Sequence, residues 1–499
     1  MGLQKSRRLE FQSIEHVSQR MKSKFNFCAR FAFSLAALFP LLVSGVDRAF
    51  IPVDGDGVLV TQKTSPAAKT AAATAAIAWA RVPVILSRIV APTFPDRDFV
   101  VTNFAAVGDG EIDCTQAFRD AMEACQKAGG GRVVVPPGIF LTGPIHLKSH
   151  VNLHVTKGAT IRFTTNTAAY LPVVFTRYEC VEVMNYSPPL YAFGQTDIAV
   201  TGEGTLDGQG SAWHRWVKEF GGDIKALYKM GDDNVPVAER IFGEARHLRP
   251  NFIQPTRCKN VLLEGVKVIN SPMWTITPLY CTNVTVRGVT VETVGPNTDG
   301  CDPDSCKDVW IKDCTFSNGD DCIAVKSGRD KDGRRVNIPC ENVVIQDCRF
   351  AAGHGGVTMG SETAGGIRNV FAERCHFDSE DLDMAMRFKT NPARGGYVED
   401  IYLRDCTVKT AKYGIHMTLR YGSSGARDGE APPTMRNIDI RNSTFGALTK
   451  GPIFVEGYSE ENKITDVAIA ECTFEPTKKG NTFTNCARIT LIGVEGISH

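Results

Sequence analysis

The sequence predicts an all-β protein folded as a parallel β-helix, a solenoid in which each coil of the chain stacks on the one before. Two observations support this prediction. Short alternating runs rich in Val and Ile fill most of the chain, and helical periodicity is almost absent beyond residue 140. A pattern that begins with Asn or Asp also recurs roughly every 22 to 37 residues, as expected for coils that stack at about 4.8 Å.

The repeats contain columns of residues that would stack from coil to coil. The leading Asn or Asp would form a ladder of side-chain hydrogen bonds. Six positions later stands a small residue suited to a tight core, and another column of cysteines lies two positions before the leading residue. The leading residues are Asn260, Asn283, Asp308, Asn342, Asn369, Asp400, Asn437 and Asp466. The small residues are Val266, Val289, Cys314, Cys348, Cys375, Cys406, Ser443 and Cys472, and the cysteines before the ladder are Cys258, Cys281, Cys306, Cys340 and Cys486.

The first 46 residues are predicted to form a signal-peptide region. Basic residues extend to Arg30, and an apolar stretch of 16 residues follows over 31–46, with small residues for cleavage at 43–45. Residues 1–20 fit no signal, so Met21 is an alternative start. The pattern predicts an exported protein, periplasmic or secreted, without stable membrane insertion after signal removal. An uncleaved membrane anchor is the alternative.

The rest of the chain divides into a short leading segment and one large domain. Residues 47–95 are expected to be a linker, with an Ala/Thr-rich run over 67–78 and a short helix over 80–90. The solenoid spans 96–499. Its first helix, over 114–128, would cap the open end and cover an unpaired strand edge, and the glycines that follow suit a helix C-terminus.

Two long departures interrupt the repeat, at 210–255 and 419–433. Long loops on a rigid solenoid usually shape the substrate groove. Trp213 and Trp216 in the first loop could stack on sugar rings, and packing within the loop is the alternative.

Composition excludes several classes of function. The net charge of +1 gives no reason to expect nucleic-acid binding, and no Cys/His cluster has the spacing of a zinc site. Ten of the 16 cysteines fall in the stacked columns, which favours small core residues over a disulfide framework. The disulfide state of four others stays open: Cys114, Cys125, Cys301 and Cys322.

Four short motifs fall at one corner of consecutive repeats: Asn297-Thr298-Asp299, Gly319-Asp320-Asp321, Gly353-His354-Gly355 and Arg387-Phe388-Lys389. Counting from the small core residue places Asp320 over His354, and places Asp299 over Asp320 if its longer coil bulges outward. Crowded carboxylates repel one another, so at least one pKa should rise and leave an acid and a base at the same pH. That pair suits hydrolysis of a glycosidic bond, and the Arg/Lys pair suits the carboxylate of an acidic sugar.

These motifs resemble those of the polygalacturonase-type pectinases, glycoside hydrolase family 28, over roughly residues 96 to 499. The resemblance extends to Gly202–Gly208, Ile323–Gly328 and Met359–Glu362. It implies a right-handed, pectin-lyase-like β-helix and inverting hydrolysis of α-1,4-galacturonosyl bonds in polygalacturonate or oligogalacturonides, without a cofactor or metal. It implies that Asp320 is the general acid and that Asp299 and Asp321 hold and activate the attacking water. It also implies that His354 tunes the charge of the acid. The substrate-binding residues would be Asn297, Arg387 and Lys389.

Several alternatives stay open. The two insertions favour exo action on a chain end, with endo action or a rhamnogalacturonan hydrolase as rivals. The protein is expected to be a monomer. A pectate lyase on the same scaffold would use Asp-bound calcium. A non-catalytic carbohydrate-binding solenoid would hold polygalacturonate without shortening it.

Overall fold

The computed structural model describes residues 49–51, 57–422 and 429–497, with side chains for all of these except 49–51. The predicted signal region over 1–46, including Met21, lies outside the described residues, as does part of the second insertion. In the described part of the chain, no helix is both long and apolar enough to cross a membrane.

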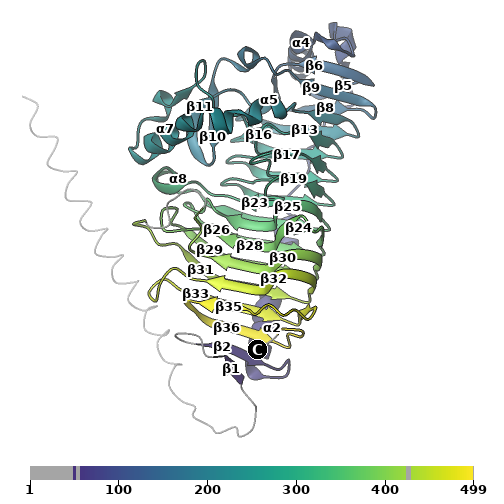
Figure 1. Cartoon of the computed structure of the whole chain (residues 1–499). Coiled ribbons are helices and arrows are strands. Elements are labelled where there is room, and N and C mark those ends of the chain that lie inside the picture. The colour runs from purple at the N-terminus through teal and green to yellow at the C-terminus, as the bar shows by residue number, and fades with distance from the viewer. Residues whose placement is uncertain (1–48, 52–56, 423–428, 498–499) are drawn as a thin grey trace, which may run out of the picture. The chain divides into compact units, whose positions relative to one another are not determined.

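Two sheets of 15 strands each run along the solenoid, and almost all of their strands pair in parallel (Figure 1). The predicted parallel β-helix is therefore confirmed. In spatial order the first sheet contains β1 (Ala49–Ile51), β2 (Val58–Thr61), β36 (Cys486–Ile492), β33 (Ile464–Ala470), β31 (Thr434–Arg441), β29 (Tyr397–Arg404), β26 (Ile367–Glu373), β24 (Cys340–Gln346), β21 (Lys307–Lys312), β19 (Thr282–Arg287), β17 (Lys259–Glu264), β13 (Thr196–Gly202), β8 (Val151–Val155), β5 (Gly131–Val135) and β3 (Asp98–Val100).

The second sheet faces the first across the core. In spatial order it contains β34 (Thr473–Phe474), β32 (Thr444–Glu456), β30 (Thr407–Thr418), β27 (His376–Asp378), β25 (Arg349–Gly360), β22 (Thr315–Ser317), β20 (Thr290–Glu292), β18 (Lys267–Ile269), β14 (Thr205–Asp207), β9 (Ala159–Phe163), β6 (Gly138–Thr142) and β4 (Asp109–Asp113), joined by β23 (Ile323–Val325), β28 (Leu382–Lys389) and β35 (Thr482–Thr484).

A third face carries the predicted site. It begins with the three-stranded sheet of β7 (Ile145–His146), β12 (Leu190–Phe193) and β16 (Ile253–Thr256), and single parallel pairs at Ile276 and Cys301 continue it to β23. The ends of β25, β28, β30 and β32 extend it further. Consecutive coils therefore place residues of the same register side by side on this face.

The predicted Asn/Asp ladder is present, and its geometry explains the choice of residue. The eight leading residues all have φ between 54° and 59°, a left-handed conformation that Asn and Asp tolerate better than other side chains. Asn283 donates to Asn260 at 2.6 Å, and Asn342 donates to Asp308 at 2.9 Å. The ladder fixes each turn and the register between neighbouring coils.

The cysteine columns are also confirmed. The backbone N–H of Cys258 donates to Cys281 Sγ at 3.4 Å, and that of Cys281 donates to Cys306 Sγ at 3.3 Å. Strand register carries the column of Cys340 through to Cys486. Every cysteine in the described residues is a buried free thiol, including the four whose state the sequence left open.

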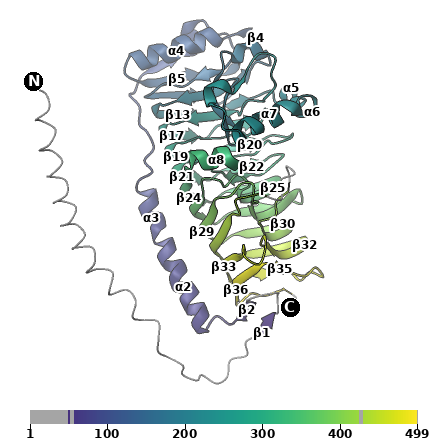
Figure 2. The same cartoon turned by 90° about the vertical axis from the view of Figure 1, so that its left-hand side faces the viewer.

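The expectation of a linker over 67–78 is wrong, because this run forms α2 (Pro66–Trp79), which α3 (Arg81–Leu86) follows. The two helices run along the outside of the first sheet (Figure 2). Trp79, Val82 and Ile85 pack against side chains of β24, β26 and β29, and Arg88 binds Asp308 of the ladder with two hydrogen bonds. Alanine-rich sequence gives a slim helix that can lie flat on a sheet. Before these helices, β2 pairs with β36 and extends the far end of the sheet.

The capping helix is α4 (Thr115–Lys127), as predicted. It packs on β3, β5 and β7 at the end of the solenoid where the coils begin, and it buries Phe118, Met122 and Cys125 against them. Its C-terminus is closed by a bond from the Gly130 N–H to the Cys125 carbonyl, with Gly130 at positive φ.

The first insertion folds as a small subdomain beside the third face (Figure 1). Trp213 and Trp216 are buried against each other and against Tyr170 and Tyr186, so the packing alternative is correct and sugar stacking by these two residues is wrong. The subdomain and its surroundings contain α5 (Ser211–His214), α6 (Trp216–Glu219), α7 (Gly221–Asp232), β10 (Val174–Tyr178), β11 (Val181–Asn185) and β15 (Ile241–Phe242). The remaining helices are α8 (Asp330–Val336) and the 3-10 helices η1 (Val101–Phe104), η2 (Thr167–Tyr170) and η3 (Val237–Glu239).

Candidate active site

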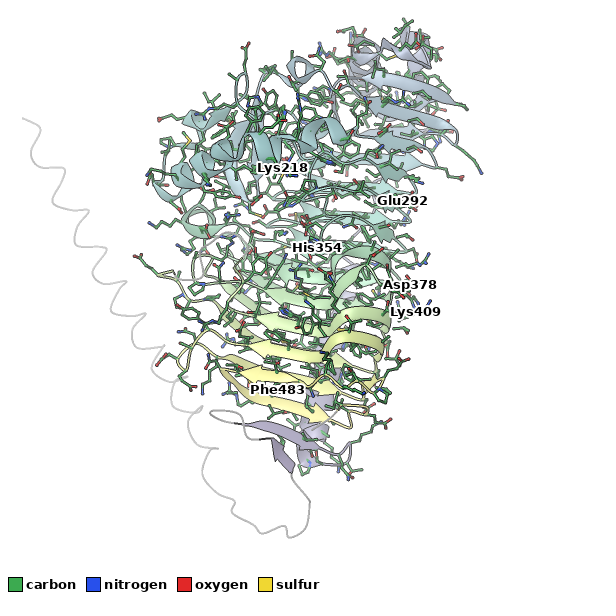
Figure 3. All side chains as sticks on the ribbon, in the orientation of Figure 1. Lys218, Glu292, His354, Asp378, Lys409 and Phe483 are labelled. Carbon is green, nitrogen blue, oxygen red and sulfur yellow. The ribbon has the colours of Figure 1, made fainter. Side chains whose placement is uncertain are left out.

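Strand register brings the four predicted motifs onto neighbouring coils near the middle of the solenoid, where Figure 3 shows His354. The pairing of β23 with β25 places Asp320 beside His354, as predicted, and the His354 N–H donates to the Asp320 carbonyl at 3.0 Å. The predicted pairing of Asp299 with Asp320 is off by one residue. Cys301 pairs with Ile323, so Asp299 lies in register with Asp321.

The three acids Asp299, Asp320 and Asp321 form one cluster. One carboxylate oxygen from each lies within 4.8 Å of the others. Asp299 and Asp321 are buried, whereas the Asp320 side chain is 20% exposed. The exposed acid is therefore the one that a ligand can reach most readily.

Asp321 is held by the two predicted cations. Arg387 Nη1 lies 2.8 Å from Asp321 Oδ1, and Lys389 Nζ lies 2.7 Å from Asp321 Oδ2. Burial by itself would raise the pKa of Asp321, but Lys389 and Arg387 outweigh it and the pKa is lowered. Asp321 is thus a permanent carboxylate, and part of the binding capacity of both cations is already used by the protein.

Asp299 has the opposite environment. Burial raises its pKa well above the usual range, repulsion from Asp320 adds to the rise, and Lys326 opposes it. Lys326 Nζ lies 3.6 Å from Asp299 Oδ2. The environments of the cluster therefore push the pKa values of Asp299 and Asp321 in opposite directions, and the rise at Asp299 is of the kind that the crowding argument predicted.

His354 lies directly beside Asp320. Its Nδ1 lies 3.1 Å from Asp320 Oδ1, and this hydrogen bond is the main reason that the pKa of His354 is raised. The ring is half exposed, so it also faces the cleft.

Lys326 and Glu362 were missed as site residues by residue-level reasoning. Lys326 Nζ lies 3.3 Å from Glu362 Oε2 and 4.6 Å from the centre of the Trp274 ring, and its side chain is 3% exposed. Glu362 is held in turn by Arg394 at 3.3 Å. Both belong to the family-like stretches Ile323–Gly328 and Met359–Glu362, which was the available signal.

Asn297 lines the cleft from its upstream edge. Its Oδ1 accepts a hydrogen bond at 2.7 Å from Arg249, a buried residue of the first insertion, and the same guanidinium donates to the Pro296 carbonyl. Arg249 therefore fixes the loop that precedes Asp299. The side-chain oxygen of Asn297 is occupied, which leaves its amide nitrogen for a ligand.

A cleft of about 380 Å³ opens over these residues. Both insertions reach it: Tyr228 of α7 comes from the first, and Tyr421 from the second. Tyr228 stacks under Arg329, 3.7 Å from the ring centre, and Arg329 binds Glu179 at 2.7 Å. The lining residues are Glu179, Tyr228, Trp274, Asn297, Asp299, Asp320, Lys326, Arg329, His354, Ser361, Glu362, Lys389 and Tyr421.

Beyond Arg387, the same face carries an aromatic cluster. His416 lies in register with Arg387, and Phe454 lies in register with His416 on the next coil. The His416 and Phe454 rings stack with centres 4.6 Å apart and planes 5° apart, and Tyr413 meets both edge-on. All three side chains are partly exposed, so an aromatic cluster continues the site toward the C-terminal coils.

Carboxylate oxygens are the ligands that Ca²⁺ prefers, and the acid cluster supplies three carboxylates. Both oxygens of Asp321 are already engaged by Arg387 and Lys389, and Lys326 lies beside Asp299. Three cations at these distances would repel a divalent ion. The residues present fit a water molecule held between carboxylates better than they fit a metal.

A parallel β-helix whose coils gather three carboxyl groups and two cations beside one cleft has the groups that a glycoside hydrolase requires. The chain matches the family model of the glycosyl hydrolases family 28 over residues 125–451, and it belongs to that family.

Similar proteins agree with this assignment. A Vitis vinifera protein described as a probable polygalacturonase is 33% identical over 356 residues, which cover 68% of this chain and 67% of that protein. An exo-poly-alpha-D-galacturonosidase from Dickeya chrysanthemi is 26% identical over 379 residues, covering 69% of this chain and 62% of that protein. The crystal structure of a hyperthermoactive exopolygalacturonase from Thermotoga maritima is 38% identical, has a TM-score of 0.77, and aligns with 84% of this chain and 96% of its own.

Proposed function

We propose that the chain hydrolyses α-1,4-galacturonosyl bonds of polygalacturonate and releases galacturonic acid from a chain end. The observation that carries the proposal is the pairing of the acid cluster with Lys389 in one cleft. The acids supply the chemistry of glycoside hydrolysis, and the cation supplies a partner for the carboxylate of the sugar. The names of the similar proteins from Vitis, Dickeya and Thermotoga support the same substrate.

In this proposal Asp320 donates a proton to the leaving oxygen, since it is the exposed member of the cluster and hydrogen bonds to His354. Asp299 and Asp321 hold the attacking water between them. Lys389 binds the substrate carboxylate while keeping its contact with Asp321, and Arg387 orients Asp321 from the other side.

Inversion of the anomeric centre is part of the proposal and rests on the family resemblance. The spacing of the acids is below 4.8 Å, whereas inverting pairs of carboxyl groups generally lie about 6.5–9.5 Å apart. The stereochemistry is therefore a direct experimental question. Inversion of an α-linked substrate gives the β-anomer first, which can be read by ¹H NMR within minutes of mixing.

Exo action is supported by the residues at one end of the cleft. Tyr228 of the first insertion, with Arg329 and Glu179, lines the cleft, and we propose that these residues close it toward the N-terminal coils, so that a chain that enters must end there. In the opposite direction the aromatic cluster of His416 and Phe454 follows the cleft. A polymer whose end lies in the cleft would pass its remaining sugars over the exposed parts of these rings.

We further propose that the enzyme is exported and acts as a monomer on cell-wall pectin. Its amino-terminal pattern supports export, and a polymer substrate must be met outside the cytoplasm. Fractionation with amino-terminal sequencing of the mature protein tests the first point, and size-exclusion chromatography tests the second.

The proposed reaction is tested by incubation with polygalacturonate, with products separated by size. If galacturonic acid is the only product from the earliest time points, exo hydrolysis is supported. A ladder of oligomers would instead indicate endo action. Products that absorb near 235 nm, or strong inhibition by a chelator, would support the lyase instead. Binding of polygalacturonate without cleavage would support a non-catalytic carbohydrate-binding solenoid. Faster cleavage of rhamnogalacturonan than of polygalacturonate would identify the protein as a rhamnogalacturonan hydrolase.

A further inference from the structure

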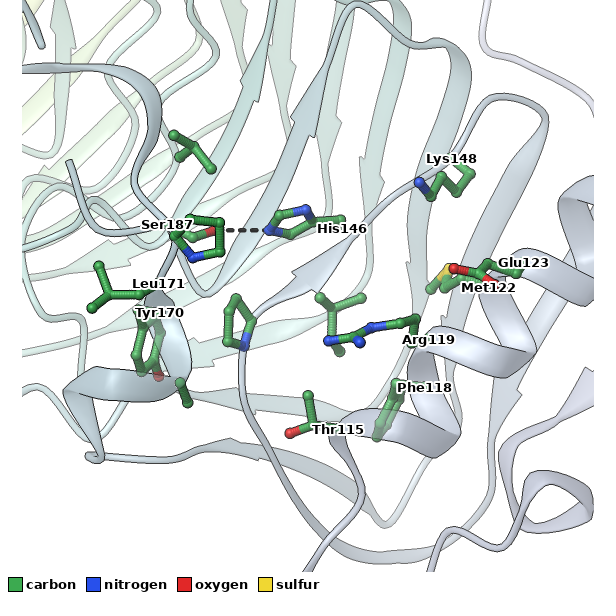
Figure 4. Close-up of a pocket in the computed structure, with 15 residues that line it drawn as sticks. Thr115, Phe118, Arg119, Met122, Glu123, His146, Lys148, Tyr170, Leu171 and Ser187 are labelled. Carbon is green, nitrogen blue, oxygen red and sulfur yellow. Dashed lines mark hydrogen bonds between the residues drawn. The ribbon is translucent and has the colours of Figure 1, made fainter. Parts of the chain in front are cut away.

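A second cavity, which we call the cap pocket, lies between α4 and the chain that leads to β10 (Figure 4). Its volume is about 230 Å³. That is below the roughly 300 Å³ at which sites for drug-sized ligands begin, so it has room for one sugar unit and not for an extended chain. Nothing in the proposed mechanism uses it.

The polar side of the cap pocket is positive. Figure 4 shows Arg119 extending from α4 into the cavity, with His146 on β7 and Lys148 on the segment that follows this strand. Within the described residues, neither Arg119 nor Lys148 forms an ion pair, and the one hydrogen bond of the Arg119 guanidinium is a long contact with Gln116. Glu123 at the rim is the only acid that lines the cavity in the described chain.

His146 reports the local field. Burial is the main cause of its lowered pKa, and the charges of Lys148 and Arg119 lower it further. Its Nε2 is 2.9 Å from the Ser187 hydroxyl, so this hydrogen bond fixes the orientation of the ring in the wall. The geometry and the field both favour an anion in the cavity.

The other walls are apolar. Phe118 and Met122 come from α4, and Tyr170, Leu171 and Pro172 face them across the cavity. A pyranose ring with a carboxylate matches this combination, because its C–H faces can rest on the apolar walls while the charge meets Arg119 and Lys148.

The cap pocket is separate from the catalytic cleft. On the third face, register leads from Ile145 through Leu190, Ile253, Ile276 and Cys301 to Ile323, which is five coils and about 24 Å at the strand spacing. The first insertion closes the cleft in this direction at Tyr228. A chain end bound in the cleft therefore stops before it reaches the cap pocket, and an occupant would belong to another stretch of polymer.

We propose that the cap pocket is an accessory site that binds one uronate unit of a neighbouring polygalacturonate segment and anchors the enzyme to its substrate. The identity of the sugar rests on the proposed function. Anchoring would raise the local concentration of chain ends for the cleft without changing the chemistry there.

The test compares Arg119→Ala/Lys148→Ala with the control Lys127→Ala/Lys157→Ala, which removes the same charge from exposed positions outside the pocket. Binding is measured by affinity electrophoresis in gels that contain polygalacturonate, with Asp320→Asn added to both to prevent hydrolysis. Turnover of trigalacturonate is measured with Asp320 intact. We expect polymer binding to weaken at least fivefold in the pocket variant alone, while kcat/KM for trigalacturonate stays within twofold of the parent.

Equal polymer binding by the two double variants would overturn the proposal. So would a tenfold fall in kcat/KM for trigalacturonate in the pocket variant, which would mean that the pocket acts through the cleft. Equal loss of binding to fully methyl-esterified polymer would overturn the recognition of charge. Failure of the parent to cleave trigalacturonate would instead count against the proposed function, and the binding comparison would still decide on the pocket.

Discussion

Replacement of Lys326 by Met removes a buried charge from the centre of the acid cluster. Breaking a buried ion pair by deleting one partner usually costs about 3–5 kcal/mol. Glu362 retains Arg394 at 3.3 Å, but in the described chain Lys326 is the only cation within 4.0 Å of Asp299. Asp299 loses its partner and Glu362 does not, so we expect a loss of about 3 kcal/mol of unfolding free energy at pH values where Asp299 is ionised in the parent.

The cost should depend on pH. Burial already raises the pKa of Asp299, and loss of Lys326 must raise it further. Below the folded pKa of the parent, Asp299 is protonated in both proteins and its share of the cost vanishes. As the pH rises between the two folded pKa values, the variant must hold a proton that the parent has released, and the cost grows by about 1.4 kcal/mol per pH unit.

Urea unfolding followed by tryptophan fluorescence, repeated across the pH range in which both proteins fold, measures this difference. Lys307→Met is the matched control, because Lys307 is 54% exposed and its ion pair with Glu341 spans 3.0 Å. The control should change stability by less than about 0.5 kcal/mol throughout that range. A loss below about 1 kcal/mol for Lys326→Met at every pH, or a loss that shrinks as the pH rises, would refute the role given to Lys326.

Three further substitutions probe the cleft. Asp320→Asn should lower kcat by about 10² or more with an unchanged unfolding midpoint, and a folded variant with full activity would remove Asp320 as the acid. Asp320 raises the pKa of His354, so the imidazolium is present below that pKa and is lost as the pH rises through it. His354→Gln should therefore abolish the fall in kcat/KM at alkaline pH that this loss causes. An unchanged pH profile would contradict this prediction. Phe454→Ala should raise KM for polygalacturonate about 2- to 10-fold and leave digalacturonate unaffected, since the ring lies beyond the cleft; equal effects on both substrates would place it elsewhere.

Much of the fold could be predicted because the same sequence pattern recurs in many coils. Each coil repeats its Asn or Asp, and several repeat a cysteine two positions before it. Both have a direct cause in the structure: a left-handed turn at Asn283 and a thiol ladder at Cys281. The α2 helix carries no such repeated signal. Its Ala-rich sequence has little amphipathic pattern, and only the sheet surface beneath Trp79 decides that it is a helix on a sheet and not a linker.

The sequence predicted most of the residues of the site, but not the register between all of its coils or the role of Lys326. Asp320 and His354 have the same spacing from the core column, so their pairing followed from the sequence. Asp299 belongs to a longer coil, and the position of its bulge decides the register, so it pairs with Asp321 instead. Lys326 becomes a site residue only because the strand turns it toward two carboxylates from other coils.

The pairing of β2 with β36 has a consequence for how the molecule is made. The strand β2 precedes every coil in the sequence, whereas its partner β36 follows all the other described strands. Stacked repeats can generally assemble from any starting point, but this pairing must wait until β36 has been synthesised. Until then β2 lacks its parallel partner, and deletion of β36 would leave this end of the sheet without the strand that joins β2 to the coils.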